Sequence, residues 1–433
     1  MGKMKVKRFL VWGLLLVLSF AIIGCSSSET SKENTDKEGS DAEKVSEKVE
    51  LTMYSWRPED REMYEKAIKK FQEKHPEISI DFQPYESTEY NTILSNALVS
   101  GDGPDILQLR PYSGATTIAD NNYLLPLDDL TGIENINKEY LDAAKGSDGK
   151  VYGVPLSLNS GVIFYNKEIF EKQGIKVPKT WDEFMTVCEK LKKNDIIPIA
   201  QSGRAAYLLS MTHAVIGPDA YGHNDFVDKI VSGDANLEDP KFVESVQRMK
   251  DLEKFFPKDF IALEDNDAQT LFYTGQAAMY INGDYRLATI EGTAPDMSIG
   301  VIPGFAAEDG GELAVTTWVD GSYAAAKNTK HPEEAKLFME FLASKEFGQI
   351  FTDESDRLSA INGVTPKHPI VKEISAAAAK HSTPYLMLVH FGEGEPTTKT
   401  TFENALQGMY LGKLTVEGVI DEAQKNADRA AKE

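Results

Sequence analysis

The stretch at residues 152–170, YGVPLSLNSGVIFYNKEIF, decides the fold class of this chain. Apolar residues on both sides of a polar patch at residues 157–160 predict two successive strands. Pro155 predicts a break in the first of them, because proline has no N–H group for a sheet ladder. The residues after Asn166 then predict a helix. This order in the middle of the chain restarts a strand-and-helix pattern that begins nearer the N-terminus.

The same alternation starts close to residue 50. Met63, Ala67, Ile68 and Phe71 share one helical face, and this predicted helix lies between two short apolar runs that predict strands. The predicted elements are, in chain order, a strand at 51–56, a helix at 59–74, a strand at 78–82, a helix at 88–100 and a strand at 105–109. Strands that alternate with helices are typical of an α/β fold with a mostly parallel sheet.

The remainder of the chain continues in the same manner. Thr180 and Glu183 have the spacing of a capping box and predict the start of a helix over residues 181–191. Residues 316–326, TTWVDGSYAAA, predict a strand with polar and aromatic residues at its centre. When the N-terminal segments are set aside, about 380 residues remain, which is more than one hydrophobic core usually organises, so we expect two lobes.

The N-terminus has the features of an export signal followed by a tether. Basic residues among the first eight precede an apolar run at 9–23 that is too short for a comfortable membrane span. Residues 22–25, IIGC, resemble the lipobox of bacterial lipoproteins, which implies that residues 1–24 are removed and that Cys25 carries a lipid. Residues 25–49 are polar and contain no aromatic side chain, so we expect a disordered tether. The alternative is an ordinary signal peptide in which Cys25 is incidental.

Composition and motifs exclude several classes of function. The formal net charge is −22 and the sequence lacks a basic stripe, so a nucleic-acid-binding role is not expected. With Cys25 used by the anchor, Cys188 has no partner for a disulfide or a thiolate metal site. The histidines lack the spacing of a zinc-protease motif, and no nucleophile elbow, phosphate loop or dinucleotide fingerprint is present. We therefore expect a non-enzyme without metal or cofactor.

Short motifs spread along the chain resemble one family. In chain order they are PDILQL, YGVP followed by FYNKEIF, VPKTWDEF, FYTGQAAMYINGDY, SYAAAKNTKHPEEAKLFMEFLAS and ALQGMYLGK. Together they resemble the extracellular solute-binding proteins of family 1, the sugar-binding receptors of bacterial ABC importers, from about Val49 to the C-terminus. The resemblance implies a two-lobed periplasmic-binding-protein-like fold of class II topology, with the ligand in a cleft between lobes that are joined by several hinge crossings.

The resemblance also implies how the chain is divided between the lobes. The expected hinge crossings lie near Pro155, near residues 316–318 and near Ala360. The expected N-terminal lobe contains residues 50–155 and about 318–360. The expected C-terminal lobe contains residues 156–317 and about 361–433.

Candidate ligand-binding residues follow from the chemistry of a sugar. A pyranose ring has apolar C–H faces and a rim of hydroxyl groups, so its site needs flat aromatic side chains beside carboxylates or amides. In α/β sheets such a site lies beyond the carboxyl ends of the strands. The candidates on these grounds, or by their place in the resemblance, are Trp56, Glu86, Asn159, Asn282, Asp284, Tyr285, Trp318, Asp320, Arg357, His390 and Phe391.

Trp318 and Asp320 form the leading pair, because alternate residues of a strand share one face and Gly321 allows close approach of the backbone. Residues 282–285 end a predicted strand and face the cleft by resemblance, with an Asx-type turn over residues 282–284 as the alternative. Residues 390–391 lie where related proteins line the cleft, but the local sequence departs from the commoner tryptophan- or tyrosine-bearing versions.

For the other candidates a purely structural role is the alternative. Trp56 ends the first strand, where it either stacks on a sugar ring or packs under the following helix. Glu86 either accepts hydroxyl groups or is solvated at the start of the next helix. Arg357 either forks onto adjacent hydroxyl groups or pairs with a carboxylate such as Asp353 or Asp356.

Two further classes of function stay open at this point. A surface glycoside hydrolase would use a carboxylate pair such as Asp128 and Asp129 or Glu264 and Asp265, although in so acidic a chain these pairs are expected on the solvated surface. A receptor of the same fold for glycerol-phosphate or a peptide would need clustered cationic groups. Arg357 is the only cation among the candidates, which favours a neutral sugar or oligosaccharide.

The resemblance finally implies where and how the protein works. We expect a monomer on the outer face of the bacterial cytoplasmic membrane, held near the membrane subunits of an ABC permease by the lipid on Cys25. A sugar bound by both lobes would stabilise the closed form in proportion to its extra contacts there, and the permease would sense that form.

Overall fold

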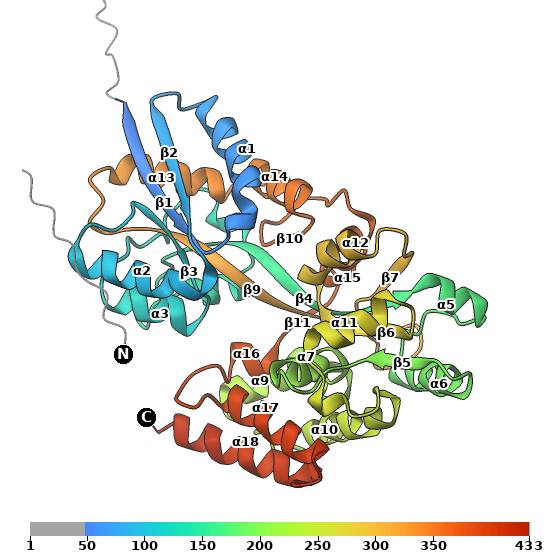
Figure 1. The fold of residues 1–433 in the computed structure, drawn as a ribbon. Coiled ribbons are helices and arrows are strands. Elements are labelled where there is room, and N and C mark those ends of the chain that lie inside the picture. The colour runs from blue at the N-terminus through green and yellow to red at the C-terminus, as the bar shows by residue number, and fades with distance from the viewer. Residues whose placement is uncertain (1–47, 433) are drawn as a thin grey trace, which may run out of the picture. The chain divides into compact units, whose positions relative to one another are not determined.

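Two long strands organise the fold of residues 48–432, the part of the chain that the computed structural model describes (Figure 1). β4 (Val154–Asn166) and β9 (Ala314–Ala325) pair with each other in antiparallel orientation. β4 is one uninterrupted strand, so the predicted break at Pro155 is wrong. Pro155 is tolerated because the ladder register between β4 and β9 shifts on both sides of Ser157, and prolines in sheets occur at such irregularities.

The remaining strands extend this pair in both directions. β3 joins β9 near its C-terminal end, at Ser322–Ala325, whereas β6 and β7 join β4 near its C-terminal end. The strand order is β2-β1-β3-β9-β4-β6-β5, with β10 and β7 also paired to β4, and β8 and β11 also paired to β9. The other strands are β1 (Val49–Ser55), β2 (Ile78–Pro84), β3 (Ile106–Leu109), β5 (Ile197–Ala200), β6 (Ala277–Gly283), β7 (Ile299–Ile302), β8 (Gly304–Phe305), β10 (Leu358–Ser359) and β11 (Ser382–Pro384).

The sheet is mixed rather than mostly parallel. β1 pairs in parallel with β2 and β3, and β5 pairs in parallel with β6. The central contacts of β9 with β3 and β4 are antiparallel. The α/β class predicted from the alternating pattern is confirmed, and the antiparallel centre is formed by β9, a strand from a distant part of the chain.

Helices cover both halves of the sheet. The helices that pack around β1, β2 and β3 are α1 (Arg61–Gln72), α2 (Ser87–Ser100), α3 (Ser113–Asp120), α13 (Pro332–Leu342) and α14 (Lys345–Ser355). The remaining α-helices are α4 (Lys138–Leu141), α5 (Lys167–Lys172), α6 (Trp181–Lys193), α7 (Tyr207–Ile216), α8 (Pro218–Tyr221), α9 (His223–Ser232), α10 (Pro240–Leu252), α11 (Asp265–Tyr273), α12 (Leu287–Thr293), α15 (Pro369–Ala378), α16 (Leu386–Val389), α17 (Thr398–Tyr410) and α18 (Val416–Ala430).

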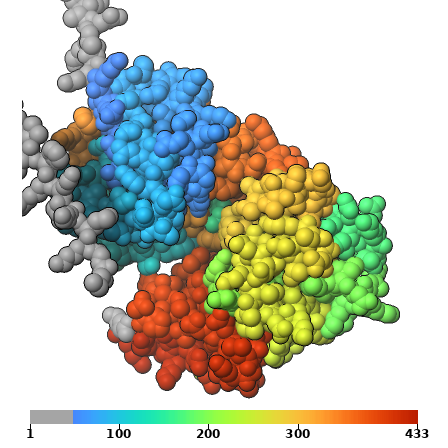
Figure 2. Space-filling view, viewed as in Figure 1, coloured from blue at the N-terminus to red at the C-terminus, as the bar shows by residue number. Residues whose placement is uncertain are grey.

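Segments far apart in the sequence share one core. α1 buries the face predicted from its periodicity, and its Phe71 packs with Phe338 of α13 and Tyr64 with Phe347 of α14. On the outside, Lys74, two residues after the end of α1, forms an ion pair with Glu346 of α14 at 2.6 Å. In Figure 2 the blue surface of the first helices accordingly adjoins the orange surface of the later ones.

β9 contributes to several hydrophobic clusters along its length. Trp318 belongs to a cluster formed with α7, α10, α17 and α18, and Val319 belongs to a cluster on the other side of the strand. Tyr323 and Ala324 belong to the two clusters around β1, β2 and β3. The described chain therefore has two groups of core residues that meet along β4 and β9, in agreement with the two-lobed fold.

The start of α6 shows how local sequence sets an element. The Thr180 hydroxyl accepts a hydrogen bond from the backbone N–H of Glu183 at 3.4 Å, as predicted. The Glu183 carboxylate, however, accepts from the backbone N–H of Lys179 at 2.7 Å, one residue before the position that a full capping box requires. The helix start was predicted correctly, and the reciprocal bond of the cap was not.

Candidate ligand-binding site

The ring of Trp56, directly after β1, is covered on both sides. Its exposed fraction is 3%, and the guanidinium of Arg110 lies 4.2 Å from the ring centroid. Tyr90 contacts the ring edge-on at 5.4 Å, and a Cβ atom added to Gly321 would lie 2.6 Å from the ring. In this arrangement Arg110, rather than the indole ring, presents the outer surface at the end of β1.

A charged cluster lies next to Trp56. Arg57 and Asp320 form a direct ion pair, and the Asn159 amide donates to the other oxygen of Asp320 at 3.1 Å. Arg357 is 3.9 Å from Asp320 and donates to Asp60 at 2.5 Å. The predicted alternative for Arg357, a pairing with a carboxylate, is therefore observed, but the partners come from β9 and from the segment after β1 rather than from its sequence neighbours.

The position of Asp320 follows from a local irregularity in β9. Val319 pairs with Leu158 and Gly321 pairs with Ser157, so Asp320 has no register partner on β4. A residue left over in this way bends the strand and redirects its own side chain. Burial works to lower the pKa of the Arg57 guanidinium, but Asp320 and the neighbouring carboxylates raise it above its ordinary value.

Asp284 connects the segment after β6 to β4. Its carboxylate is buried and accepts a hydrogen bond from the backbone N–H of Ser160 at 2.9 Å. Burial raises the pKa of Asp284 to about 7, while the Ser160 bond and the charge of Arg357 act in the opposite direction and Asp320 adds to the rise. This carboxylate consequently keeps its proton to a higher pH than an ordinary aspartate does.

Asn282 and Tyr285 are joined by a hydrogen bond between their side chains. The Asn282 amide donates to the Tyr280 hydroxyl at 2.5 Å, and its oxygen accepts from the Tyr285 hydroxyl at 2.9 Å. That oxygen also accepts from the backbone N–H of Gly283 at 2.8 Å, and Asn282 is fully buried. The geometry favours a structural role for Asn282, close to the turn given as the alternative, while the half-buried ring of Tyr285 lies over Gly283.

Trp318 lies opposite Asn159 in the ladder between β9 and β4, so the two side chains share a face. Its exposed fraction is 7%, and its ring contacts Tyr385 edge-on at 5.5 Å. Through Asn159, which is bonded to Asp320, Trp318 is linked to the charged cluster. The predicted aromatic and carboxylate pair is thus connected through an amide.

Trp318 also borders a cavity of about 680 Å³. Its lining includes aromatic rings, an amide and carboxylates, among them those of Tyr112, Tyr140, Asn224, Glu139, Asp142, Asp228 and Glu393. His390 lines the same cavity, and burial lowers the pKa of its imidazole although Asp142 and Asp228 act to raise it. Two of the predicted candidates, Trp318 and His390, therefore meet at one cavity.

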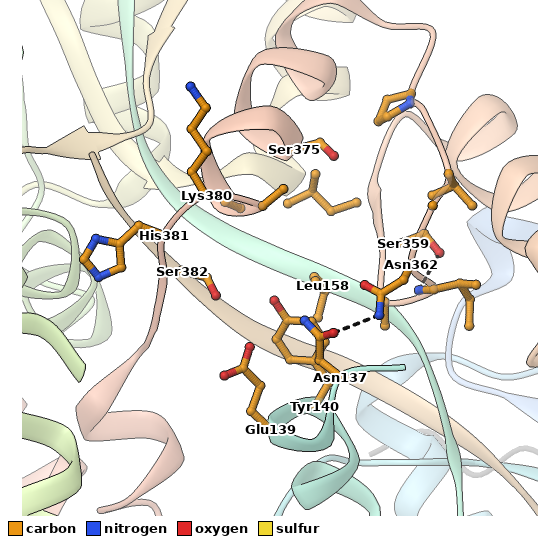
Figure 3. Close-up of a pocket in the computed structure, with 18 of the residues that line it drawn as sticks. Asn137, Glu139, Tyr140, Leu158, Ser359, Asn362, Ser375, Lys380, His381 and Ser382 are labelled. Atoms are coloured by element: carbon orange, nitrogen blue, oxygen red, sulfur yellow. Dashed lines mark hydrogen bonds between the residues drawn. The ribbon is translucent and has the colours of Figure 1, made fainter. Parts of the chain in front are cut away.

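A neighbouring cavity of about 600 Å³ lies beside β4 and shares Glu139 and Tyr140 with the first cavity (Figure 3). Leu158, which alternates with Asn159, contributes to its wall, and Asn362 donates to Asn137 at 2.8 Å. Figure 3 shows Glu139 extending toward Ser382, and burial raises the pKa of this glutamate. None of the predicted candidates lines this cavity, and its lining includes the rings of Tyr140 and His381.

Two candidates lie apart from the charged cluster. Glu86 is exposed at the N-cap of α2 and its side chain makes no cap hydrogen bond. Phe391 packs against the hydrophobic cluster of α17 and α18, and its carbonyl accepts from the backbone N–H of Lys399 at 2.9 Å. Cys25 lies outside the described residues.

Two other kinds of site are absent from the described part of the chain. Residues 48–432 contain no group of three or more histidine, cysteine or acidic side chains placed to hold a metal ion. Within the same residues, no helix has the length and apolar character needed to span a bilayer. Cys188 is buried without a disulfide partner, and burial raises the pKa of its thiol.

Comparison with known protein families identifies the class of protein to which this chain belongs. The family described as bacterial extracellular solute-binding protein matches residues 55–349. The chain belongs to this family. The resemblance seen in the sequence motifs is thereby confirmed. Members of this family are solute-binding proteins, which confirms that this chain is a solute-binding protein and not an enzyme.

The alignments with named relatives cover most of this chain and most of each relative. The multiple sugar-binding protein of Streptococcus mutans is 24% identical over 378 residues, which are 84% of this chain and 86% of the relative. The arabinooligosaccharide-binding protein of Bacillus subtilis is 26% identical over 367 residues, 80% of this chain and 78% of the relative. The structure of RafE in complex with raffinose shares the fold, with a TM-score of 0.70 at 20% identity over 88% of this chain and 99% of RafE.

Sequence reasoning missed several residues of this solute-binding protein that lie near the predicted ones. Arg57 is the second residue after β1 and Arg110 directly follows β3, so the rule that placed Trp56 at a strand end also applies to them. Tyr207, at the start of α7, has an exposed fraction of 39%, and Tyr385 contacts Trp318. No sequence signal separates these two tyrosines from the other aromatic residues of the chain.

Proposed function

We propose that this solute-binding protein captures a sugar or short oligosaccharide outside the cell and delivers it to the permease of an ABC importer. The observation that carries the proposal is the connection of Trp318, Asn159 and Asp320 at the crossing of β4 and β9. An aromatic ring beside an amide and a carboxylate is the combination that a pyranose requires. The names of the relatives, a multiple sugar-binding protein and an arabinooligosaccharide-binding protein, support the same ligand class.

The charge balance of the cluster supports a neutral ligand. Arg57 and Arg357 are each within ion-pair distance of Asp320, and Arg357 is also paired with Asp60. Their positive charge is therefore largely compensated before any ligand binds. A phosphate or a peptide carboxylate would have to compete with these carboxylates, whereas sugar hydroxyl groups can use the remaining donor and acceptor sites.

Each proposed contact has a separate task. Trp318 and Tyr285 would cover C–H faces, Asp320 and Asn159 would bind hydroxyl groups, and Arg357 would hold Asp320 in place. For Trp56 the proposal requires that Arg110 moves aside or itself contacts the sugar, because Arg110 covers the ring. Glu86, Asp284, His390 and Phe391 remain proposed contacts at the edges of the site, and Asn282 is proposed to orient Tyr285.

Binding is proposed to drive closure of two lobes. The proposed N-terminal lobe contains residues 50–155 and about 318–360, and the proposed C-terminal lobe contains residues 156–317 and about 361–433. A ligand that contacts groups of both lobes stabilises the arrangement in which those groups are close together. Small-angle X-ray scattering with and without saturating sugar measures this directly, and an unchanged radius of gyration contradicts it.

The proposed location rests on the N-terminal sequence. Residues 1–24 are proposed to be an export signal, Cys25 the lipidated first residue, and residues 25–49 a tether that keeps a monomeric receptor at the outer face of the cytoplasmic membrane. Mass spectrometry of the purified membrane fraction tests the anchor. Recovery of an unmodified N-terminus other than Cys25 contradicts it.

A thermal-shift titration tests the ligand class. The panel contains raffinose, stachyose, arabinotriose and chitotriose, with glycerol-phosphate and a short peptide as controls. A ligand at a hundred times its Kd adds about 2.7 kcal/mol of stability. We expect at least one sugar to raise Tm, and Trp318→Ala to abolish that shift while the variant stays folded. A shift with glycerol-phosphate or the peptide alone refutes the sugar proposal.

A further inference from the structure

Tyr385 lies at a junction between Trp318 and the segment that carries His390. Its ring contacts Trp318 edge-on, with ring centroids 5.5 Å apart and an interplanar angle of 70°. Its backbone N–H donates to the carbonyl of Thr317, the residue before Trp318, at 3.1 Å. Its own carbonyl accepts from the backbone N–H groups of the first turn of α16, including Val389 at 2.9 Å. One residue therefore touches β9 twice and also starts the helix that leads to His390.

The hydroxyl group of Tyr385 is anchored in the interior. It lies 2.6 Å from the Ser210 hydroxyl of α7, which in turn lies 2.6 Å from the Glu403 carboxylate of α17. Ser210 has one proton, and the Glu403 carboxylate at 2.6 Å is a closer acceptor than the Tyr207 carbonyl at 3.1 Å, so Ser210 donates to Glu403 and accepts from Tyr385. Lys399 forms an ion pair with the same carboxylate. These groups make a continuous chain of polar contacts that ends at the ring facing Trp318.

Because these contacts are buried, they hold the side chains in place more firmly than contacts at the surface would. Tyr385, Ser210 and Glu403 are all buried. Groups removed from water make their hydrogen bonds at well-defined positions, because an unmade bond there costs more than at the surface. The Tyr385 ring is consequently held by its hydroxyl at one end and by its backbone at the other.

We propose that Tyr385 is a positioning residue for the ligand site. It fixes the orientation of the Trp318 ring and the start of α16, and so sets the distance between Trp318 and His390 across the cavity that both residues line. This inference rests on the proposed function, because it assigns Trp318 as a sugar contact. Tyr385 acts through Trp318 and does not itself line that cavity.

The variant Tyr385→Phe tests the proposal with little risk to folding. It keeps the ring and the backbone bonds, and it leaves Ser210 bonded to Glu403, so no charge is left unpaired. The matched control is Tyr410→Phe in the same hydrophobic cluster, because the Tyr410 hydroxyl is also buried and donates to the carbonyl of Met249 at 2.7 Å. Each variant loses one buried hydrogen bond of tyrosine.

Isothermal titration of the purified proteins with the tightest-binding sugar among raffinose, stachyose, arabinotriose and chitotriose gives the readout. We expect similar small decreases of Tm in both variants. Only Tyr385→Phe should weaken Kd, by about threefold to tenfold, the equivalent of one hydrogen bond that no longer fixes the site. A purely structural role of the hydroxyl would lower Tm without this selective change in Kd.

A second variant keeps the inference falsifiable if Tyr385→Phe folds poorly. Ser210→Ala removes the acceptor of the Tyr385 hydroxyl and leaves both rings unchanged, so it should weaken Kd in the same direction. Equal Kd values for the wild type, Tyr385→Phe and Ser210→Ala overturn the positioning role and leave the sugar receptor intact. If the wild type binds none of the four sugars, the proposed function fails, and the positioning role falls with it.

Discussion

Replacement of Asp320 by asparagine is expected to destabilise the protein through the two arginines that face it. Asp320 forms an ion pair with Arg57 and lies 3.9 Å from Arg357, while Asn159 donates to its other oxygen. Asparagine keeps the size of the side chain and one acceptor oxygen. It removes the negative charge that holds the two guanidinium groups near each other, and Asp60 then remains as the carboxylate paired with Arg357.

The magnitude follows from the burial of the pair. Breaking a fully buried ion pair by removing one partner costs about 3–5 kcal/mol, whereas an exposed pair contributes about 0–1 kcal/mol. The side chains of Arg57 and Asp320 have exposed fractions of 20% and 14%, which places this pair between the two limits but nearer the buried one. We therefore expect Asp320→Asn to lower the free energy of unfolding by about 2–3 kcal/mol.

Urea unfolding followed by circular dichroism measures this loss. The matched control is Asp102→Asn, because Asp102 is exposed in the loop after α2 and has no ion-pair partner among residues 48–432. The control should change stability by less than about 0.5 kcal/mol. The double variant Arg57→Gln with Asp320→Asn should lose less than the sum of the two single variants. A loss below about 0.5 kcal/mol for Asp320→Asn, or strict additivity in the cycle, refutes the coupling derived from the structure.

Two further predictions concern Asp284 and Gly321. The pKa of Asp284 is raised to about 7 in the fold, so the folded protein retains a proton that the unfolded chain releases, and the contribution of Asp284 to stability should fall as pH rises from about 4 to 7. Asp284→Asn should flatten that part of the pH profile of urea unfolding, and an unchanged slope contradicts the assignment. Gly321→Ala should destabilise by about 1–3 kcal/mol because the added Cβ meets the Trp56 ring, whereas Gly292→Ala in α12 meets no atom within 4 Å and serves as the control. Equal Tm values for the two alanine variants would show that the Trp56 ring moves to accommodate the added Cβ atom without loss of stability.

Local patterns predicted the elements well because they depend on near neighbours. The buried face of α1 and the start of α6 follow from spacings of three or four residues, which a sequence displays directly. Pro155 misled the prediction because its tolerance depends on the register shift against β9, more than 150 residues away. The mixed character of the sheet was not predicted for the same reason, because the strand that lies between β3 and β4 is the distant β9.

The candidate site could be predicted only in part. Trp318, Asp320 and Asn159 were named from their places at strand centres and ends, and the structure brings them together. Arg57 was missed, although it follows Trp56 directly, because its significance arises from a partner 263 positions later. The covering of Trp56 by Arg110 was likewise invisible, since a cation above a ring leaves no periodic signal.

The long strands β4 and β9 also constrain the order in which the chain can fold. β9 ends at Ala325 and fills the place between β3 and β4, which are both complete by Asn166. Until β9 has been synthesised, β3 and β4 lack their shared neighbour, and their unpaired edges stay open to other chains. Contacts between such distant segments form slowly because a long loop must close first. The first 166 residues therefore cannot complete their sheet alone, and a nascent chain shorter than about 325 residues should remain a substrate for chaperones.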